Sequence, residues 1–197
     1  MTKGNEVVFE SNKIRLKDKN LNVMMDWETE LMQRHAEIVC QHGGHILEIG
    51  FGMGISAGFI QQQPIQSHTI IEINPQILIR AKQFAQDKPN VTVIYGDWVE
   101  VFKKHPKTYD GIWYDADCAQ LNMFRKHVVD RFLNEDGIFT YFDPKGSDRY
   151  SYGDALQMDE VNITREIEPN AYHNDSVCKV PYYINNNQTN RKQKQWQ

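Results

Sequence analysis

Short apolar runs alternate along the chain with segments whose apolar residues recur at helical spacing. The apolar runs predict strands over residues 45–49, 69–73, 91–95, 111–114 and 137–142. The helical spacing predicts helices over residues 55–62, from Pro75 onward, over 98–104 and around 121–133. Because near-continuous apolar strands separated by helices form parallel sheets covered on both faces, the predicted fold class is α/β.

The segment before the first of these strands has a different pattern. Two β-like runs within residues 7–16 predict a hairpin or a lid. Apolar residues at helical spacing over 26–41 predict a helix, which ends at the glycine pair Gly43 and Gly44. The hairpin or lid is therefore expected to come first, and the helix to lead into the alternating region.

The pattern weakens after Phe142. Residues 161–167 and 177–184 predict a closing pair of strands, and the polar residues that follow predict disorder. The expected organisation is a lid segment over 1–22, one folded domain over 23–184 and a disordered tail over 185–197.

Composition and charge exclude several classes of protein. A chain of 197 residues, 40% of them hydrophobic, is long enough for one α/β domain. The net charge of −4 argues against a nucleic-acid partner, and no apolar run approaches the ~20 residues of a membrane span or forms the core of a signal peptide. The three distant cysteines and the scattered histidines have no metal or disulfide spacing, so we expect a cytoplasmic protein without a metal site.

A glycine-rich turn directly follows the first predicted strand. Gly50, Gly52 and Gly54 give the spacing G-x-G-x-G immediately after Glu48. Glycine tolerates positive φ and has no Cβ, so a nucleotide-like ligand can lie against the backbone N–H groups of such a turn. A nicotinamide-binding loop would carry its third glycine at the position of Ile55, and this sequence does not.

Acidic residues stand at the carboxyl ends of successive predicted strands, where ligands of open α/β sheets bind: Glu48, Glu72, Asp97 and Asp115. Glu72 is placed to accept hydrogen bonds from ribose hydroxyls. Asp97 can accept from an adenine amino group, and Trp98 can cover the ring. Because several carboxylates would repel a pyrophosphate, they favour S-adenosylmethionine, which carries a cationic sulfonium and no phosphate.

Four blocks then carry a resemblance to a known family: V-M-M-D-W-E-T at 23–29, L-E-I-G-F-G-M at 47–53, I-E-I-N at 71–74 and Y-D-G-I-W-Y-D at 109–115. With them the chain resembles class I S-adenosylmethionine-dependent methyltransferases, and more specifically the guanidinoacetate N-methyltransferase family with its fungal-type arginine N-methyltransferase relatives. The resemblance implies a Rossmann-like fold with a mostly parallel seven-stranded sheet and helices on both faces.

The resemblance also implies roles for particular residues. In the family, the acids at the positions of Glu28 and Asp115 grip the substrate guanidinium and are catalytic, and backbone after the fifth strand touches substrate, here Pro144 and Lys145. A guanidinium is a poor nucleophile beside a sulfonium cation, and paired carboxylates offset the charge and accept the released proton. The expected cofactor-binding residues are Met24, Met32, Glu48, Gly50, Phe51, Gly52, Met53, Gly54, Ile55, Glu72, Asn74, Asp97 and Trp98.

The sequence leaves the identity of the methyl acceptor open at this point. A small guanidino molecule is favoured, either free arginine or a compound like guanidinoacetate, with S-adenosyl-L-homocysteine as the second product; arginine in a protein is the alternative. The D-A-D segment at 115–117 also resembles metal-dependent O-methyltransferases, and a nucleoside-binding module without catalysis is a third hypothesis. We expect a monomer or a homodimer.

Overall fold

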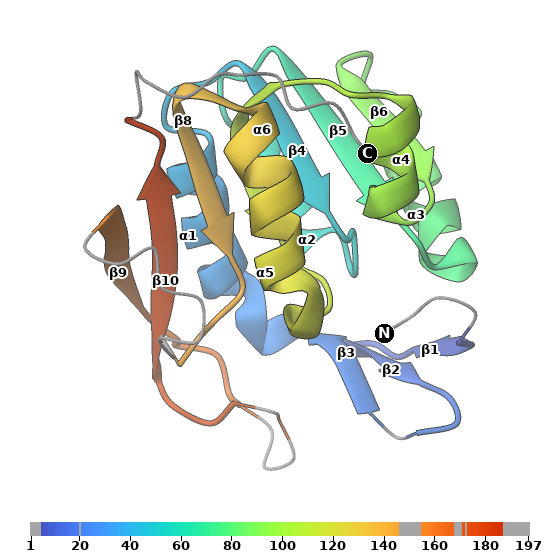
Figure 1. The fold of residues 1–197 in the computed structure, drawn as a ribbon. Helices are drawn as coiled ribbons and strands as arrows, with labels where there is room; N and C mark the ends of the chain where they lie inside the picture. The colour runs from blue at the N-terminus through green and yellow to red at the C-terminus, as the bar shows by residue number, and fades with distance from the viewer. Residues whose placement is uncertain (1–4, 20, 146–154, 168–170, 172, 187–197) are drawn as a thin grey trace.

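The larger of two sheets forms the body of the molecule (Figure 1). The structure, a computed structural model, describes residues 5–19, 21–145, 155–167, 171 and 173–186. Within them the larger sheet contains β4 (His45–Ile49), β5 (Ser67–Glu72), β6 (Val91–Tyr95), β7 (Tyr109–Tyr114), β8 (Leu133–Tyr141), β9 (Leu156–Asn162) and β10 (Val177–Ile184). The strand order is β6-β5-β4-β7-β8-β10-β9.

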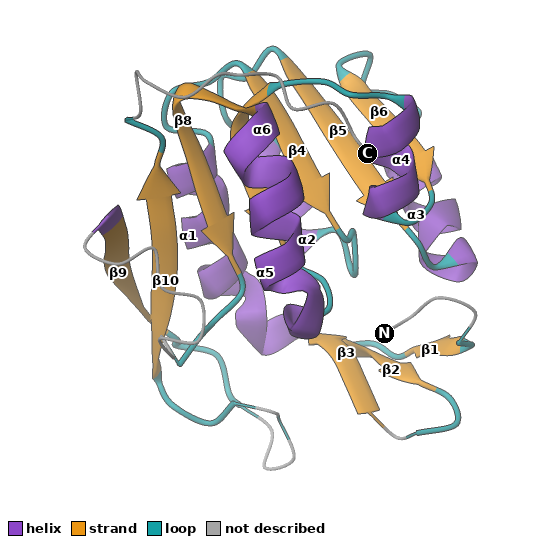
Figure 2. Cartoon of the chain, in the orientation of Figure 1, coloured by secondary structure: helices purple, strands orange, loops and turns teal. Residues whose placement is uncertain are grey.

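In this order the first five strands, β6, β5, β4, β7 and β8, are parallel, whereas β10 runs antiparallel to both β8 and β9. Helices cover both faces of this sheet (Figure 2). They are η1 (Asp26–Glu28), α1 (Thr29–Val39), α2 (Ile55–Ile60), α3 (Pro75–Ala85), α4 (Trp98–Lys104), η2 (Cys118–Gln120), α5 (Leu121–Phe124), the π-helical η3 (Arg125–Val129) and α6 (Asp130–Phe132). The predicted α/β class, with its mostly parallel sheet of seven strands, is confirmed.

Side chains that alternate in direction along each strand form a hydrophobic core on each face of the larger sheet. On β4, Ile46 packs with α1 and α2, whereas its neighbour Leu47 packs with α4 and α5. On β7, Trp113 packs on the same face as Ile46, and Ile112 packs on the same face as Leu47. Since successive side chains of a strand point to opposite faces, two apolar residues in a row are needed to bury both sides of the sheet, which explains the continuous apolar runs.

The N-terminal residues form a second sheet below the carboxyl edge of the first (Figure 1). It consists of β1 (Val7–Phe9), β2 (Lys13–Leu16) and β3 (Leu21–Met25), paired antiparallel in the order β1-β2-β3. The predicted hairpin over 7–16 is confirmed, and the sequence analysis missed β3. The Val7 N–H donates to Gln76 Oε1 at 2.8 Å, and Val7 and Leu16 pack with Ile77 of α3, so this sheet is fastened to the body.

Several predicted boundaries differ from the structure; β8, for example, begins at Leu133 rather than at residue 137. The outer strand is β9 over Leu156–Asn162 rather than residues 161–167, because an edge strand exposes polar residues such as Gln157 and Glu160 and lacks an apolar run. The helix expected over 26–41 begins with the short η1. Asn185, assigned to the tail, exchanges backbone hydrogen bonds of 2.9 Å with Gly137 and Asp136. The rest of the tail prediction, over 187–197, lies outside the described residues.

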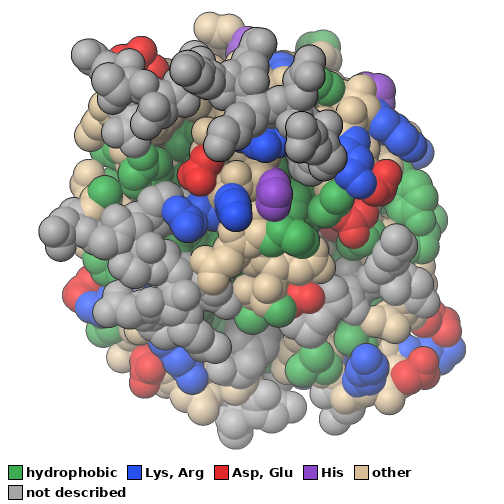
Figure 3. All heavy atoms as spheres, in the orientation of Figure 1, with side chains coloured by type: hydrophobic (Ala, Val, Ile, Leu, Met, Phe, Trp, Pro, Cys, Tyr) green, Lys and Arg blue, Asp and Glu red, His purple; other side chains and the backbone are tan. Residues whose placement is uncertain are grey.

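Charged side chains of both signs are interspersed on the face of the molecule that Figure 3 shows. No helix in the described part of the chain combines the length and the apolar character needed to cross a bilayer.

Candidate functional site

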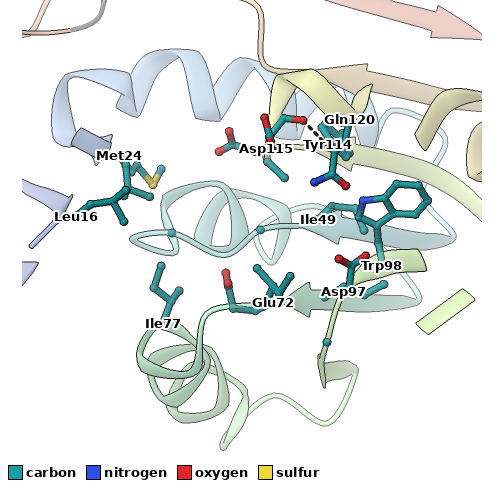
Figure 4. Close-up of a pocket in the computed structure, with 18 of the residues that line it drawn as sticks. Leu16, Met24, Ile49, Glu72, Ile77, Asp97, Trp98, Tyr114, Asp115 and Gln120 are labelled. Carbon is teal, nitrogen blue, oxygen red and sulfur yellow. Dashed lines mark hydrogen bonds between the residues drawn. The ribbon is translucent and has the colours of Figure 1, made fainter. Parts of the chain in front are cut away.

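A pocket opens at the carboxyl edge of the larger sheet, between that edge and the N-terminal sheet (Figure 4). Three of the four acids predicted at strand ends line it: Glu72, Asp97 and Asp115. The other lining residues are Leu16, Leu21, Asn22, Val23, Met24, Ile49, Gly50, Gly52, Ile71, Ile73, Ile77, Gly96, Trp98, Tyr114, Ala116, Asp117 and Gln120. The pocket therefore stands where open α/β sheets hold their ligands.

Gly50 brings the glycine-rich turn after β4 close to the ends of β5 and β7. Its φ is 89°, its N–H donates to the carbonyl of Ile71 at 2.9 Å, and the N–H of Asp115 donates to the carbonyl of Ile49 at 3.0 Å. A Cβ on Gly50 would lie 2.3 Å from the carbonyl oxygen of Asp115. Only glycine allows the turn after β4 to pass this close to Asp115, and this approach places the turn and that carboxylate at the same pocket.

We predict that Gly50→Ala will destabilise the fold by at least ~2 kcal/mol and abolish ligand binding, because it adds both a clash with backbone and a strained φ. Gly58 in α2 is the matched control, since a Cβ there meets nothing within 4 Å. Gly58→Ala should be neutral or stabilising by up to ~1 kcal/mol. Thermal and chemical unfolding of both variants test the prediction, and equal stabilities would contradict it.

Glu72 is held by the backbone on either side of it. Its Oε2 accepts from the N–H of Phe51 in the glycine turn at 2.9 Å, and its Oε1 accepts from the N–H of Asn74 at 2.7 Å. The side chain is buried yet reaches the pocket lining. Burial raises its pKa, the backbone hydrogen bonds act in the opposite direction, and the nearby Glu48 raises the pKa further. These hydrogen bonds hold the Glu72 carboxylate in one orientation, in which it can accept hydrogen bonds from a ligand in the pocket.

Asp115 follows β7 directly and is half-buried. Removal from water, and then the charges of Glu48 and Glu72, raise the pKa of Asp115 from the ordinary 3.8 to about 7. The Tyr114 hydroxyl donates to the carbonyl of Asp117 at 2.9 Å, and this bond shapes the loop that carries Asp115. A carboxyl group that titrates near neutrality can hold a cation or accept a proton under physiological conditions.

The two ends of the pocket differ in chemistry (Figure 4). At one end, Asp97 caps α4 by accepting from the N–H of Val99 at 2.9 Å, and Trp98 packs edge-on against Phe124 with ring centroids 5.1 Å apart. At the other end lies Met24, whose sulfur accepts from the N–H of Met53 at 3.1 Å. A flat aromatic group suits the Trp98 end, and an aliphatic chain suits the Met24 end.

The charge of the lining has one sign. Glu72, Asp97, Asp115 and Asp117 contribute carboxylates, and no Lys, Arg or His stands among the described residues that line the pocket. After burial, the charges of Glu72 and of the buried Glu48 behind the lining raise the pKa of Asp115, because negative charge is concentrated at this edge of the sheet. Such a pocket attracts cations and repels phosphates.

Several predicted cofactor residues lie outside the lining. Glu48 is fully buried; it accepts from the Ser56 hydroxyl, and its Oε2 lies 2.9 Å from His68 Nε2. Asn74 caps α3 by accepting from Gln76 at 2.9 Å, and Met32 is a core residue of α1. The remaining ones belong to the turn and the start of α2, where they shape the loop: Phe51, Met53, Gly54 and Ile55.

Of the predicted acceptor-side residues, Asp115 lines the pocket and the other three lie outside the lining. The Oε1 of Glu28 accepts from the N–H of Met25 at 2.6 Å, which makes Glu28 the capping residue of η1, and its side chain is buried. The Pro144 carbonyl accepts from the N–H of Lys179 on β10 at 2.9 Å, while Lys145 is exposed. The structure therefore brings Asp115 into the pocket and leaves Glu28 four residues beyond the pocket residue Met24.

Sequence reasoning missed the contribution of the N-terminal sheet and of the segment after Asp115. Leu16, Asn22 and Val23 line the pocket from β2 and β3, and a recognised β3 would have pointed to them. Asp117 was visible as the second acid of D-A-D. No sequence signal pointed to Gln120, which lies at the Trp98 end of the pocket (Figure 4).

Residues 3–175 match the protein family described as guanidinoacetate N-methyltransferase. The chain belongs to this family. The family and the fold together make it a class I methyltransferase of the S-adenosylmethionine-dependent type. The resemblance that the W-E-T and G-F-G-M blocks carry is confirmed for the family as a whole.

Curated relatives support this membership. The protein arginine N-methyltransferase 2 of Aspergillus fumigatus is 34% identical over 152 residues, which cover 73% of this chain and 36% of that protein. The protein of the same name from Saccharomyces cerevisiae is 32% identical over 167 residues, covering 75% of this chain and 40% of its own length. The chain thus spans well under half of these relatives.

Solved structures share the fold. Spermidine synthase from Thermotoga maritima superposes with a TM-score of 0.61 over 91% of this chain and 72% of its own, at 13% identity. The N-methyltransferase NodS from Bradyrhizobium japonicum, in complex with S-adenosyl-L-homocysteine, gives a TM-score of 0.58 over 81% of this chain and 87% of its own, at 16% identity. At such low sequence identity these structural similarities establish a shared fold and nothing further.

Proposed function

We propose that the chain is an S-adenosylmethionine-dependent N-methyltransferase that acts on the guanidino group of a small molecule, such as free arginine or a guanidinoacetate-like acid. In this proposal Glu28 and Asp115 hold the guanidinium. Glu72 accepts hydrogen bonds from the ribose of the cofactor, Asp97 accepts from its adenine, and Trp98 covers the ring. Family membership and the curated arginine-methylating relatives support this assignment.

The observation that carries the proposal is the negative pocket beside the glycine turn. Both reactants of guanidine methylation are cations, and bringing them together in water is unfavourable. A lining of four carboxylates without a basic residue among its described members offsets both charges. A nucleotide with a pyrophosphate would be repelled by the same lining, and the structural neighbour NodS was solved with the phosphate-free S-adenosyl-L-homocysteine.

The chemistry requires positioning and the removal of a proton. Bound S-adenosylmethionine supplies an activated methyl group for in-line displacement. Carboxylates that accept pairs of guanidinium N–H groups orient the attacking nitrogen and localise its lone pair. Asp115, with a pKa of about 7, can accept the released proton at neutral pH, and Glu28 is held in one orientation by its cap to Met25. A carboxylate has about four acceptor sites, so this cap leaves capacity for a guanidinium fork.

A protein acceptor is the second candidate, because the curated relatives are named protein arginine N-methyltransferase 2. The relatives are much longer than this chain, which matches only 36% and 40% of those two proteins. A metal-dependent reaction has less support: no cluster of three or more His, Cys, Asp or Glu suited to a metal ion is present in the described ranges.

Radiolabelled S-adenosylmethionine with a panel of acceptors tests the proposal. We expect label to enter free arginine or guanidinoacetate at a rate well above that for an arginine-containing peptide, with no change on adding a chelator. Transfer to the peptide alone would establish the protein-directed reaction instead. Calorimetric binding of S-adenosylmethionine without transfer to any acceptor would show a binding module, and the catalytic proposal would then be wrong.

A further inference from the structure

A fully buried acid, Glu48, stands behind the pocket and has no role in the function proposed so far. Its Oε1 accepts a hydrogen bond from the Ser56 hydroxyl of α2. Its Oε2 lies 2.9 Å from His68 Nε2 on β5, at an angle that makes this contact electrostatic rather than a hydrogen bond. Because an isolated buried carboxylate is very costly, these partners from two further elements are what allow Glu48 to stay ionised in the interior.

The imidazole of His68 leaves the charge of Glu48 uncancelled. His68 is itself fully buried, and its Nδ1 lies 3.4 Å from the side-chain amide nitrogen of Gln61. An amide N–H can only donate, so this contact assigns the lone pair to Nδ1 and the ring proton to Nε2, which faces Glu48. A ring with one proton is neutral, and the group formed by Glu48, Ser56 and His68 therefore carries one net negative charge.

Strand register places Glu48 on the same face of the sheet as Asp115. Glu48 is the register partner of Trp113 on β7, which packs with Ile46, two residues before Glu48. Asp115 comes two residues after Trp113, and its N–H donates to the carbonyl of Ile49 at 3.0 Å, so the ladder between the two strands continues to this point. Since side chains two residues apart on a strand point to one face, Glu48 stands one step behind the Asp115 carboxylate.

Several titratable groups interact with Glu48. They come from three elements: Cys40 from the end of α1, His68 and Glu72 from β5, and Asp115 from the end of β7. Burial is the largest cause of the raised pKa of Asp115, and the charge of Glu48 comes next, ahead of that of Glu72. Glu48 is thus the charged side chain that acts most strongly on Asp115, although it does not line the pocket.

We propose that Glu48 is a positioning residue for methyl transfer: its buried charge, held by Ser56 and His68, acts on Asp115 from behind and makes that carboxylate a stronger base. This inference rests on the proposed function. As the nitrogen–methyl bond forms and the sulfur–methyl bond breaks, the guanidino nitrogen loses its proton to Asp115. Two like charges on neighbouring strands repel, and the repulsion is relieved when Asp115 takes up this proton.

Two substitutions separate the charge of Glu48 from its packing. Glu48→Gln removes the charge at nearly constant size, and Glu48→Asp keeps the charge on a shorter side chain. The matched control is Asp110→Asn at the opposite end of β7, where a structural carboxylate accepts from the His45 N–H at 2.7 Å and from the Asn134 amide at 2.7 Å. The measurement is kcat/KM for the guanidino acceptor from about pH 5 to about pH 9 with saturating S-adenosylmethionine.

We expect kcat/KM of the unsubstituted chain to rise through a pH of about 7, the pKa of Asp115. Glu48→Gln should move this rise about one pH unit lower and reduce the activity above it, because a weaker base accepts the proton less readily. Glu48→Asp should return the rise to its original position. Asp110→Asn should change kcat/KM by the same factor at every pH, as a purely structural loss does.

A rise at the same pH in an active Glu48→Gln variant would overturn the inference and leave Glu48 a structural residue. Should Glu48→Gln fail to fold, a carbon NMR titration of the unsubstituted chain decides. Asp115 titrating near 7 beside an ionised Glu48 would support the inference, whereas Asp115 titrating near its ordinary 3.8, or Glu48 protonated at neutral pH, would overturn it. An unsubstituted chain that methylates no guanidino acceptor would instead refute the proposed function.

Discussion

Replacing Asp115 with asparagine should lower kcat/KM for the guanidino acceptor by roughly 10³-fold while S-adenosylmethionine still binds. Asparagine has nearly the same shape but carries no charge and cannot accept the proton. Asp115 reaches the pocket directly from β7, and its pKa of about 7 suits proton acceptance at neutral pH. Steady-state kinetics with labelled cofactor, together with calorimetry of cofactor binding, measure the two effects separately.

The matched control for this substitution is Asp136→Asn. Asp136 is exposed, remote from the pocket in β8, and has a φ of 58°, which asparagine tolerates as well as aspartate does. The control should keep full activity. Near-normal turnover of Asp115→Asn, with the control also active, would remove Asp115 from the catalytic role.

The pH dependence gives Asp115→Asn a second readout. The folded-state pKa of about 7 lies above the ordinary 3.8, so this carboxyl group lowers stability as pH rises from about 4 to about 7, and the loss is complete once pH exceeds the folded-state pKa. Asn carries no such cost, and the variant should therefore melt at a higher temperature than the unsubstituted chain at pH 8, with the difference disappearing near pH 4. Activity of the unsubstituted chain should rise through pH 7 as the carboxylate forms.

The central strands were predictable from sequence because each is buried on both faces. β4 and β7 are largely apolar, with runs such as residues 46–47 and 111–114, and the glycine turn after β4 marks the ligand edge. β9 lacked this signal since it is exposed at the sheet edge. β3 was hidden because Met24 and Met25 run into the helix-like pattern that begins at Asp26, and strand-to-helix transitions within one apolar stretch leave no local mark.

The candidate site could be predicted as a set of strand ends but not as a set of side-chain directions. Glu48 lies one residue before Ile49 on β4 and therefore points to the opposite face, where it meets Ser56 and His68. Ile70 is the register partner of Glu48, and Glu72 lies two residues beyond it on the same face of the sheet, at the end of β5, where it reaches the pocket. Whether such an acid meets the ligand or the core therefore depends on how far along the strand it stands as well as on the face to which it points.

Glu28→Gln is the second decisive substitution, with an expected fall in kcat/KM of about 10²-fold. The Oε1 of Glu28 accepts from the N–H of Met25 at 2.6 Å, and a glutamine amide oxygen can take over this capping bond. The fold should then be retained, with a change in unfolding free energy below ~1 kcal/mol. What the variant loses is the negative charge that a guanidinium requires, and the amide NH₂ that replaces one oxygen faces a cation without attraction.

The comparison with Glu28→Ala isolates this charge. Alanine removes the cap as well, so it should lower stability by about 1 kcal/mol and activity at least as much as glutamine does. Glu37→Gln on α1 is the control: Glu37 pairs with Arg34 at the surface, 2.9 Å apart, and its loss should cost no more than ~0.5 kcal/mol and no activity. If Glu28→Gln keeps normal kinetics while Glu28→Ala unfolds, Glu28 is a helix cap only. The guanidinium would then be held by Asp115 without it, and the two-carboxylate grip would be wrong.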